Sequence, residues 1–454
     1  MLVADTICAL ATPPGTGGLA VIRVSGPDAF GLVQPCLQTR TDLAKAEGHT
    51  IHYAAFVDGG SIVDTVTASV FRAPRSYTGE DCVEIGCHGG RIVARNIVAA
   101  LVRQGARPAE PGEFTKRAFL NNKLDLTQVE AVADVIHAVS TPGAQAAARQ
   151  LTGGFTKRLA DIRNRLMDVC GLLELELDFS EEDLEFVDKN ELHRQLREIG
   201  QVCRDLTESY ESAHILRNGY QVGLIGFPNA GKSSLMNALL GRRRAIVSDT
   251  PGTTRDYLEE TLHMDGIAFK LYDTAGMRSS DDQIEIEGIK LAESIVEQSN
   301  CVLVINDAGA GATHSDELAE SMRARFGHVR IFTVQNKIDL VKQDIDELKQ
   351  NRDDLFISAS SGEGLDALRA HLVELATSSS ARVNDVLIND RHVGLLQQVI
   401  ESINNAAASI ESAPSNEFIA VDVRLALKTL GEITGDNWSE DLLTEVFSRF
   451  CIGK

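Results

Sequence analysis

Cysteine is scarce in this chain, and none of it falls in a metal-binding pattern. Eight cysteines among 454 residues are too few for a disulfide scaffold, and no two of them form a CxxC pair. A thiolate zinc site and an oxidising compartment are therefore disfavoured. The sequence also lacks an apolar run of about 18 residues and a basic N-terminal region, so we expect neither a membrane span nor a signal peptide. A cytoplasmic protein without membrane attachment is predicted.

Basic residues are also few relative to acidic ones. The chain carries 44 Lys and Arg against 65 Asp and Glu, which gives a formal net charge of −21. Because phosphate contacts need clustered Lys and Arg, this balance argues against broad binding to nucleic acid or to anionic membranes. A nucleic-acid partner would have to meet a local basic patch or a surface on another protein.

The first half of the chain contains two different patterns of apolar residues. Residues 1–118 contain short β-type runs separated by Gly and Pro residues typical of turns, which predicts a compact α+β domain. Over 119–218 the period changes, and apolar residues recur at spacings of three and four, as from Leu159 to Leu173. That spacing predicts an all-α helical domain.

The second half of the chain begins with a third pattern and then returns to helical spacing. Residues 219–380 alternate short apolar strands with helical segments, as in a parallel α/β sheet, and end in a serine run at 378–380 that we interpret as a linker. The helical period resumes over 381–454, which ends in the CIGK tail. The economical interpretation is a multidomain chain in which one helical domain is interrupted by an inserted α/β domain.

A phosphate-binding loop is the strongest single motif. The run 226–233 fits GxxxxGK[ST], follows the apolar strand 222–225 and precedes the apolar helix 234–240. In that context glycines let backbone N–H groups cradle phosphate at a helix N-terminus. Lys232 would reach the β- and γ-phosphates, and the Ser233 hydroxyl would ligate Mg²⁺.

Three further motifs follow in the order that GTPases require. A DxxG run at 273–276 places an Asp near Mg²⁺ and a Gly where it can sense the γ-phosphate. An NKxD run at 336–339 supplies a carboxylate that accepts two hydrogens from guanine, and 358–360 supplies backbone contact to the guanine oxygen. Adenine offers no such donor pair, so the domain is predicted to bind GTP and not ATP. The candidate GTP-binding residues are Asn229, Ala230, Gly231, Lys232, Ser233, Ser234, Ser248, Asp249, Thr250, Thr253, Thr254, Asp273, Thr274, Ala275, Gly276, Asn336, Lys337, Asp339, Ser358, Ala359 and Ser360.

The residue after the DxxG motif is unusual for a GTPase. Ras-type enzymes orient the attacking water with a Gln at this place, whereas this chain has Met277. Asn229 and the oxygens of the loop 248–256 could instead surround a monovalent cation, which would bring positive charge to the phosphates. Carboxylates that could position water follow downstream, and any one of them is also readily explained as an exposed acid: Asp281, Asp282, Glu285 and Glu287.

Taken together, these residues resemble those of the MnmE (TrmE) family of tRNA wobble-uridine modification GTPases over the whole length of the chain. The runs 228–234 (PNAGKSS) and 249–256 (DTPGTTRD) are shared with Era-like GTPases generally. Three segments narrow the resemblance to this family: 11–23 near the start, 117–126 (RAFLNNKLDL) and 450–454 (FCIGK).

The resemblance implies an N-terminal domain that binds 5-formyl- or methylene-tetrahydrofolate and forms a homodimer. Arg23, Glu80, Lys123 and Lys454 match the family's folate contacts. The match is chemically reasonable, since cations suit the glutamate tail of folate and a carboxylate suits the pterin. Without the resemblance, Arg23 and Glu80 would be interpreted as surface charges.

The resemblance also implies the ions of the GTPase site and its catalytic residue. K⁺ would be held by Asn229 together with Ser248, Thr250 and Thr253, and Mg²⁺ by Ser233 and Thr254. Glu285 matches the glutamate that orients the attacking water. Ser248 departs from the commoner Thr, but a carbonyl ligand is not altered by that exchange.

Partners and chemistry follow from the same resemblance. The family acts with an FAD-dependent protein, MnmG, in a heterotetramer, and modifies C5 of uridine 34 in certain tRNAs to aminomethyl or carboxymethylaminomethyl uridine with a folate one-carbon unit. Cys451 is the residue tied to that chemistry, on a short tail after the predicted helix 439–450. An inert cysteine is the alternative. A prenylation box is disfavoured by the Gly and Lys that end the chain.

Two other functions fit part of the sequence. An Era-like GTPase switch in ribosome assembly would explain the GTPase motifs but not the N-terminal segment or the CIGK tail. A folate enzyme with a regulatory GTPase domain is the third hypothesis. Titration with formyl-tetrahydrofolate would separate the ribosome-assembly hypothesis from the MnmE-type and folate-enzyme hypotheses.

Overall fold

The computed structural model describes residues 5–178, 188–241, 258–273, 293–310, 313–327, 329–341, 354–380, 386–412, 416–448 and 450–454. The chain forms two compact units, which we describe separately. The first comprises 1–133, 150–203 and 394–454, and the second comprises 134–149 and 204–393. The domain boundaries expected at 118, 218 and 380 stay predictions. Within the described ranges, no helix is both long enough and apolar enough to cross a membrane.

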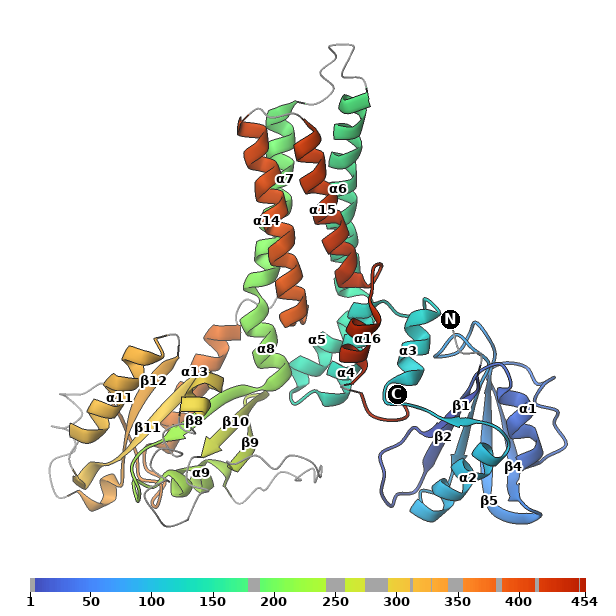
Figure 1. The fold of residues 1–454 in the computed structure, drawn as a ribbon. Coiled ribbons are helices and arrows are strands. Elements are labelled where there is room, and N and C mark those ends of the chain that lie inside the picture. Colours follow the sequence, from blue (N-terminus) through green and yellow to red (C-terminus); the bar gives the residue numbers. More distant parts are fainter. Residues whose placement is uncertain are drawn as a thin grey trace. The chain divides into compact units, whose positions relative to one another are not determined.

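The first unit begins with a seven-stranded sheet in the order β3-β4-β5-β6-β2-β1-β7 (Figure 1). Its strands pair antiparallel except β1 with β7, which run parallel. The two-residue hairpin between β4 and β5 uses Gly59 and Gly60, both at positive φ (54° and 83°), as a turn that matches strand twist requires. The strands are β1 Ile7–Leu10, β2 Ala20–Ser25, β3 Leu37–Gln38, β4 Thr50–Asp58, β5 Ser61–Phe71, β6 Cys82–Cys87 and β7 Arg107–Pro108.

Helices pack on this sheet and bury its apolar side chains. The core combines Ile22 and Val24 of β2 with Ile97 and Leu101 of helix α2 (Arg91–Arg103), and it also takes in the short α1 (Ala29–Val33) and η1 (Gln34–Cys36). Residues two apart on β2 face the same side, so Arg23 and Ser25 share the opposite face. The α+β architecture expected of this segment is therefore present.

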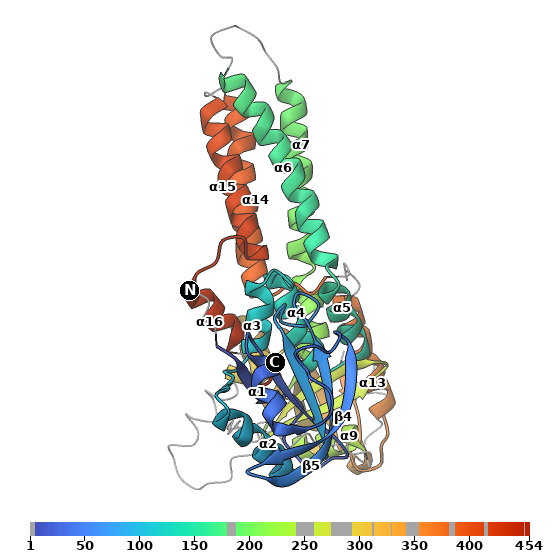
Figure 2. The ribbon, with the colours of Figure 1, turned by 90° about the vertical axis from the view of Figure 1, so that its right-hand side faces the viewer.

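Long helices make up the rest of the first unit. The residues 159–173 that showed helical spacing lie within α6, and α6 packs along α15; Figures 1 and 2 show both views of this pair. The helices that lie wholly or mainly here are α3 Glu113–Leu120, α4 Leu126–His137, α6 Gly154–Asp178, α7 Lys189–Glu208, α14 Asp390–Ser412, α15 Asn416–Thr434 and α16 Glu440–Phe447.

The C-terminal tail is held by backbone pairing. Helix α16 begins at the N-cap Ser439, whose Oγ accepts a hydrogen bond from Leu442 N at 3.2 Å, and it ends at Phe447, three residues before the expected end. Ile452 then forms an antiparallel bridge with Pro111. Gly453 is buried, and a Cβ there would lie 2.2 Å from Leu10 O. The tail is therefore docked against the N-terminal domain.

The second unit is built on a six-stranded sheet in the order β13-β12-β11-β8-β10-β9. All neighbours are parallel except β9 and β10. The chain passes from one side of β8 to the other, and in open α/β sheets ligands bind at the carboxyl ends of strands at such a switch point. The strands are β8 Tyr220–Ile225, β9 Leu258–Met264, β10 Ile267–Asp273, β11 Cys301–Asp307, β12 Arg330–Asn336 and β13 Leu355–Phe356.

Helices cover both faces of this sheet. Alternate residues of β11 enter different cores: Leu303 packs with α9 and α13, and Val302 packs with α11. Helix α8 precedes β8 and packs against α13, so the entry and the exit of the α/β fold are adjacent. The helices are α5 Thr141–Leu151, whose last two residues lie in the first unit, α8 Tyr210–Asn218, α9 Lys232–Leu240, η4 Ala308–Ala310, α11 Thr313–Arg325, η5 Ile338–Leu340 and α13 Leu365–Ser380.

The interpretation of the serine run 378–380 as a linker is wrong, because these residues form the last turn of α13. Ser378 Oγ donates to Leu375 O at 2.9 Å, and Thr377 Oγ1 donates to Val373 O at 2.7 Å. Such bonds let hydroxyl side chains satisfy themselves within a helix rather than end it. Packing of Leu375 and Ala376 in the core then outweighs the weak helix propensity of serine.

Candidate GTPase site and N-terminal ion-pair cluster

The phosphate loop joins the end of β8 to the start of α9. Three of its residues have positive φ: Gly226 (155°), Asn229 (64°) and Gly231 (96°). A Cβ at Gly231 would lie 2.2 Å from Asn336 Nδ2, so this position needs glycine for space as well as for conformation. Lys232 begins the helix, and the loop N–H groups precede a helix N-terminus, as phosphate binding requires.

Lys232 is buried behind the loop. Its Nζ donates to Gly226 O at 2.7 Å and to Phe227 O at 3.1 Å. Burial lowers the pKa of the Lys232 ammonium, and the charge of Asp273 opposes that shift. The ammonium is thus held by two loop carbonyls at the place where a bound phosphate would offer it stronger, charged acceptors.

Ser233 and Asp273 form the candidate magnesium site. Ser233 Oγ donates to Asp273 Oδ2 at 3.0 Å, although the two residues are 40 positions apart. A hydroxyl beside a carboxylate fits Mg²⁺, which takes few protein oxygens and completes its shell with water and phosphate. No group of three or more His, Cys, Asp or Glu side chains suited to a metal occurs in the described part of the chain.

The guanine motif is connected to the phosphate loop. Asn336 Nδ2 donates to Ala230 O at 3.0 Å, and Asn336 Oδ1 accepts from Ala359 N at 3.1 Å. Ser360 Oγ donates to Asp339 Oδ2 at 3.0 Å. Hydrogen bonds from the Ser358 and Ser360 hydroxyls hold the pKa of Asp339 below its ordinary value. Asp339 is therefore kept as an ionised acceptor beside the serine motif.

Asp307 is a residue at this site that the motif analysis missed. It ends β11 next to Asn336, which ends β12, and its Oδ2 accepts from Lys337 Nζ at 2.8 Å. The hydrogen bond from Lys337 holds the pKa of Asp307 below its ordinary value. The available signal was its place at the end of an apolar strand, as for Asp273.

The structure thus brings together the described parts of the four motifs. Several predicted residues lie outside the described ranges, and their roles stay predictions. They are Ser248, Asp249, Thr250, Thr253, Thr254, Thr274, Ala275, Gly276 and the proposed catalytic Glu285.

In the first unit, Arg23 is enclosed by aromatic rings. Its guanidinium lies 5.0 Å from the centre of the Tyr77 ring and 5.5 Å from that of Phe114. Its Nε and Nη2 both lie 2.8 Å from Glu84 Oε1 across the strand pair β2–β6. Arg23 Nη1 is buried and has no hydrogen-bond partner among the described residues. An orphaned donor of this kind suits an anionic or carbonyl ligand.

The other predicted folate residues lie around helix α3. Glu80 Oε2 accepts from Ser25 Oγ at 2.7 Å, and Lys123 Nζ donates to Pro74 O at 3.0 Å. A Cβ at Gly79 would be 3.3 Å from Lys123 Cγ, so Lys123 borders the loop that carries Glu80. Lys454 O accepts from Phe114 N at 3.2 Å, which places the end of the chain beside the ring that faces Arg23.

Cys451 lies on the docked tail with its side chain exposed, whereas the other seven cysteines are buried. Its carbonyl accepts a hydrogen bond from Gly112 N at 3.3 Å. The tail and Arg23 therefore share one neighbour, the start of α3. A reagent that attacks thiols should reach Cys451 before the others.

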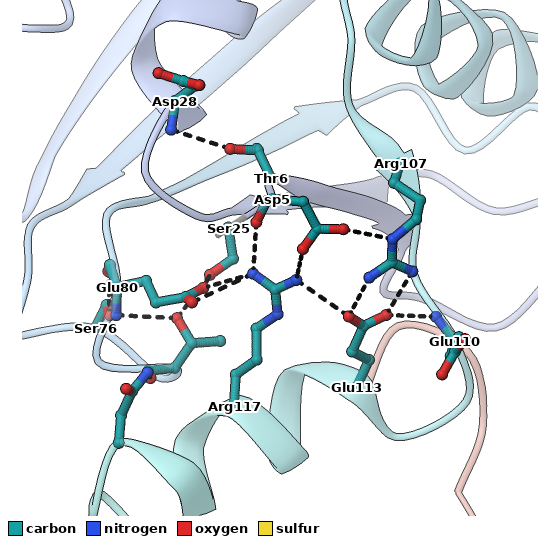
Figure 3. A network of polar contacts seen from close by, with 12 residues as sticks. Asp5, Thr6, Ser25, Asp28, Ser76, Glu80, Arg107, Glu110, Glu113 and Arg117 are labelled. Carbon is teal, nitrogen blue, oxygen red and sulfur yellow. Dashed lines mark hydrogen bonds and ion pairs between the residues drawn. The ribbon is translucent and has the colours of Figure 1, made fainter. Parts of the chain in front are cut away.

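Sequence reasoning also missed a cluster of ion pairs centred on Arg117 (Figure 3). Arg117 and Arg107 bind the carboxylates of Asp5 and Glu113, and Arg117 also binds Glu80. A sequence signal existed for only part of it, since 113 and 117 have the spacing of an ion pair within one helix.

Known proteins match this chain over its whole length. Residues 6–123 match the family described as the GTP-binding protein TrmE N-terminus, and 126–451 match the MnmE helical domain. The tRNA modification GTPase MnmE of Christiangramia forsetii is 40% identical over 474 residues, covering 100% of both chains. The protein of the same name from Salinibacter ruber is 40% identical over 463 residues, again covering 100% of both.

Solved structures match a smaller part. The G domain of the Thermotoga maritima (T. maritima) FeoB iron transporter is 27% identical, with a TM-score of 0.28, and the match covers 35% of this chain and 98% of that one.

Proposed function

The chain belongs to the MnmE family of tRNA modification GTPases, as its motifs predicted, and we propose that it couples K⁺-dependent GTP hydrolysis to modification of the wobble uridine. The proposed product is aminomethyl or carboxymethylaminomethyl uridine at position 34 of certain tRNAs. The observation that carries the proposal is that one chain contains a phosphate loop hydrogen-bonded to the NKxD motif and, in its N-terminal domain, Arg23 and Glu80 near a tail with an exposed thiol.

GTP binding uses groups that are already in place. The phosphates would accept hydrogen bonds from the loop N–H groups and from Lys232, which would leave the Gly226 and Phe227 carbonyls. Asp339 would accept the paired guanine hydrogens. Because Asn336 contacts the phosphate loop directly, base recognition and phosphate binding support each other.

Hydrolysis needs charge neutralisation and an oriented water. We assign Mg²⁺ to Ser233 and Thr254, and K⁺ to Asn229 with Ser248, Thr250 and Thr253. Glu285 would orient the attacking water. Support for these assignments comes from the Ser233–Asp273 contact, from the left-handed backbone at Asn229 in the loop, and from Met277 at the place of a catalytic Gln.

The N-terminal domain would bind 5-formyl- or methylene-tetrahydrofolate through Arg23, Glu80, Lys123 and Lys454. The orphaned Arg23 Nη1 and the partly exposed Glu80 carboxylate suit a ligand with an acceptor and N–H donors. Folate supplies a one-carbon unit when bound. Cys451 would act in the modification step, and this domain would hold the homodimer together.

The partners in this proposal are the FAD-dependent protein MnmG, in a heterotetramer, and tRNA. Because the chain itself is acidic, tRNA would be met mainly on a basic surface of the partner. An Era-like role in ribosome assembly is not needed, since the relatives align with the whole chain and not only with its GTPase part.

Nucleoside analysis of bulk tRNA tests the proposal directly. A strain that lacks this chain should lose C5-modified wobble uridines and regain them when the wild-type chain is supplied. Unchanged levels in the deletion strain would refute the tRNA role while leaving the GTPase site intact.

A further inference from the structure

The cluster around Arg117 joins the start of the chain to helix α3 (Figure 3). The Arg117 side chain is only 7% exposed. Its Nη2 donates to Asp5 Oδ1 at 2.6 Å and to Glu113 Oε1 at 3.1 Å, and its Nη1 donates to Asp5 O at 2.8 Å. Nη1 also lies 3.2 Å from both carboxylate oxygens of Glu80. Arg117 is therefore the direct link between the ion pairs and the proposed folate residue.

Arg107 is a second arginine in the same cluster with different contacts. Its hydrogen bonds go to Asp5, Pro108 and Glu113. The distances are 2.5 Å to both Asp5 Oδ2 and Glu113 Oε1. Arg107 thus shares two acids with Arg117, which makes it a matched control for a role that depends on contact with Glu80.

The charges of the cluster do not cancel. Three carboxylates, those of Asp5, Glu80 and Glu113, face two guanidinium groups. Asp5 and Glu113 have the shortest contacts to the arginines, whereas Glu80 has only the 3.2 Å contacts and is 20% exposed. Glu80 is therefore the least compensated of the three carboxylates. A partly buried carboxylate with incomplete compensation favours a ligand that donates hydrogen bonds.

The orientation of Glu80 is fixed from two sides. Ser25 Oγ donates to Oε2 at 2.7 Å, and Nη1 of Arg117 contacts both oxygens. Ser25 and Arg23 share one face of β2, and Phe114, next to Glu113 in α3, lies under Arg23. The carboxylate is thus held in the same neighbourhood as the orphaned Arg23 donor.

We propose that Arg117 is a positioning residue that orients the Glu80 carboxylate for a ligand with two adjacent N–H donors, the pattern of a 2-amino-4-oxopyrimidine ring. The inference rests on the proposed folate function and adds a residue to it. Arg117 itself does not contact the ligand. Its Nη1 holds both acceptor oxygens before binding, so the ligand does not have to order them.

Titration calorimetry on the full chain tests this assignment with 5-formyl-tetrahydrofolate as the probe. Arg117→Gln should weaken binding about 10-fold, the effect of one misplaced charged hydrogen-bond acceptor. Arg107→Gln should change affinity by less than about 3-fold, because it leaves the Glu80 contacts intact. Arg117→Lys should fall between these, since it keeps the charge but not the planar guanidinium that contacts Asp5, Glu80 and Glu113 at once. Thermal unfolding of each variant reports structural damage separately.

A second readout distinguishes positioning from general destabilisation. An analogue that lacks the 2-amino group should bind the wild type more weakly than the parent folate, and Arg117→Gln should reduce that discrimination. Arg107→Gln should retain it. If Arg117→Gln does not fold, Arg117→Lys carries the same comparison.

The outcomes separate this inference from the function on which it rests. If the wild type binds no folate, the proposed folate site and the role of Arg117 both fail. If the wild type binds and Arg117→Gln binds equally well with the same discrimination, the positioning role alone is refuted. Equal losses of affinity in the Arg107 and Arg117 variants, matching their losses of thermal stability, would also refute it and assign Arg117 to structure.

Discussion

Asn336 Nδ2 donates a hydrogen bond to Ala230 O at 3.0 Å and so connects the guanine motif with the phosphate loop across 106 residues of sequence. The same amide accepts from Ala359 N at 3.1 Å, so a single buried side chain joins three of the four nucleotide motifs. The phosphate-binding and guanine-binding parts of the site are therefore linked through Asn336. A substitution there should weaken binding of the phosphates as well as of the base.

Asn336→Ala should weaken binding of both GDP and GTP about 10- to 100-fold, because it leaves the buried Ala230 carbonyl without its donor. Stopped-flow release of a fluorescent GDP would show most of the loss as faster dissociation. An affinity within 2-fold of the wild type would mean that the bond to Ala230 does not organise the loop.

Asp339→Asn should shift preference from guanine toward xanthine nucleotides, since the amide offers one acceptor and gains a donor for the xanthine 2-carbonyl. Competition binding with GTP and xanthosine triphosphate measures the change. Asp366→Asn is the control, because Asp366 is 98% exposed and pairs only locally, with Arg369 at 3.1 Å. A wild type that bound ATP as tightly as GTP would overturn the guanine assignment.

Asp307→Asn should speed GDP release about 2- to 5-fold, because Lys337, within the NKxD motif, loses an ion pair of 2.8 Å. The pair is partly exposed, so the effect should shrink in high salt. Glu259→Gln removes a comparable pair, Lys270–Glu259 at 3.3 Å, and should leave nucleotide release unchanged. Equal effects of the two substitutions would deny Asp307 a specific role.

Potassium should be required for fast hydrolysis. Replacing K⁺ with Na⁺ should slow GTP turnover at least about 10-fold, which corresponds to about 1.4 kcal/mol of transition-state stabilisation. Asn229→Ala should lower the rate in K⁺ and remove the difference between the two salts. Phosphate-release assays at saturating GTP measure both, and equal wild-type rates in the two salts would exclude a potassium site.

Cys451→Ser should abolish wobble-uridine modification while GTP turnover persists near the wild-type rate. A serine hydroxyl is close in size to a thiol but is a much weaker nucleophile, so the loss would be chemical rather than steric. Cys203→Ser is a matched exchange at a buried cysteine. Normal levels of modified uridine in a Cys451→Ser strain would make this cysteine a bystander.

The sequence by itself determined the GTPase motifs, the helical periods and the family. These signals are local. A glycine-rich run between a strand and a helix, or apolar residues spaced by three and four, can be recognised within a window of about twenty residues. Local spacing was misleading at residues 378–380, where core packing keeps a serine run helical.

Only the tertiary structure decided which distant groups meet. The bond from Asn336 to Ala230, the bridge from Ile452 to Pro111 and the contacts of Arg117 with Asp5 and Glu80 join residues 37 to 341 positions apart. Such pairs leave no periodic trace, because they join backbone groups or single polar side chains that have no distinctive sequence neighbours. Their selection comes from the packing of elements within each unit, which aligns the strand ends of the second unit and, in the first, buries the charges around α3 where a partner compensates them.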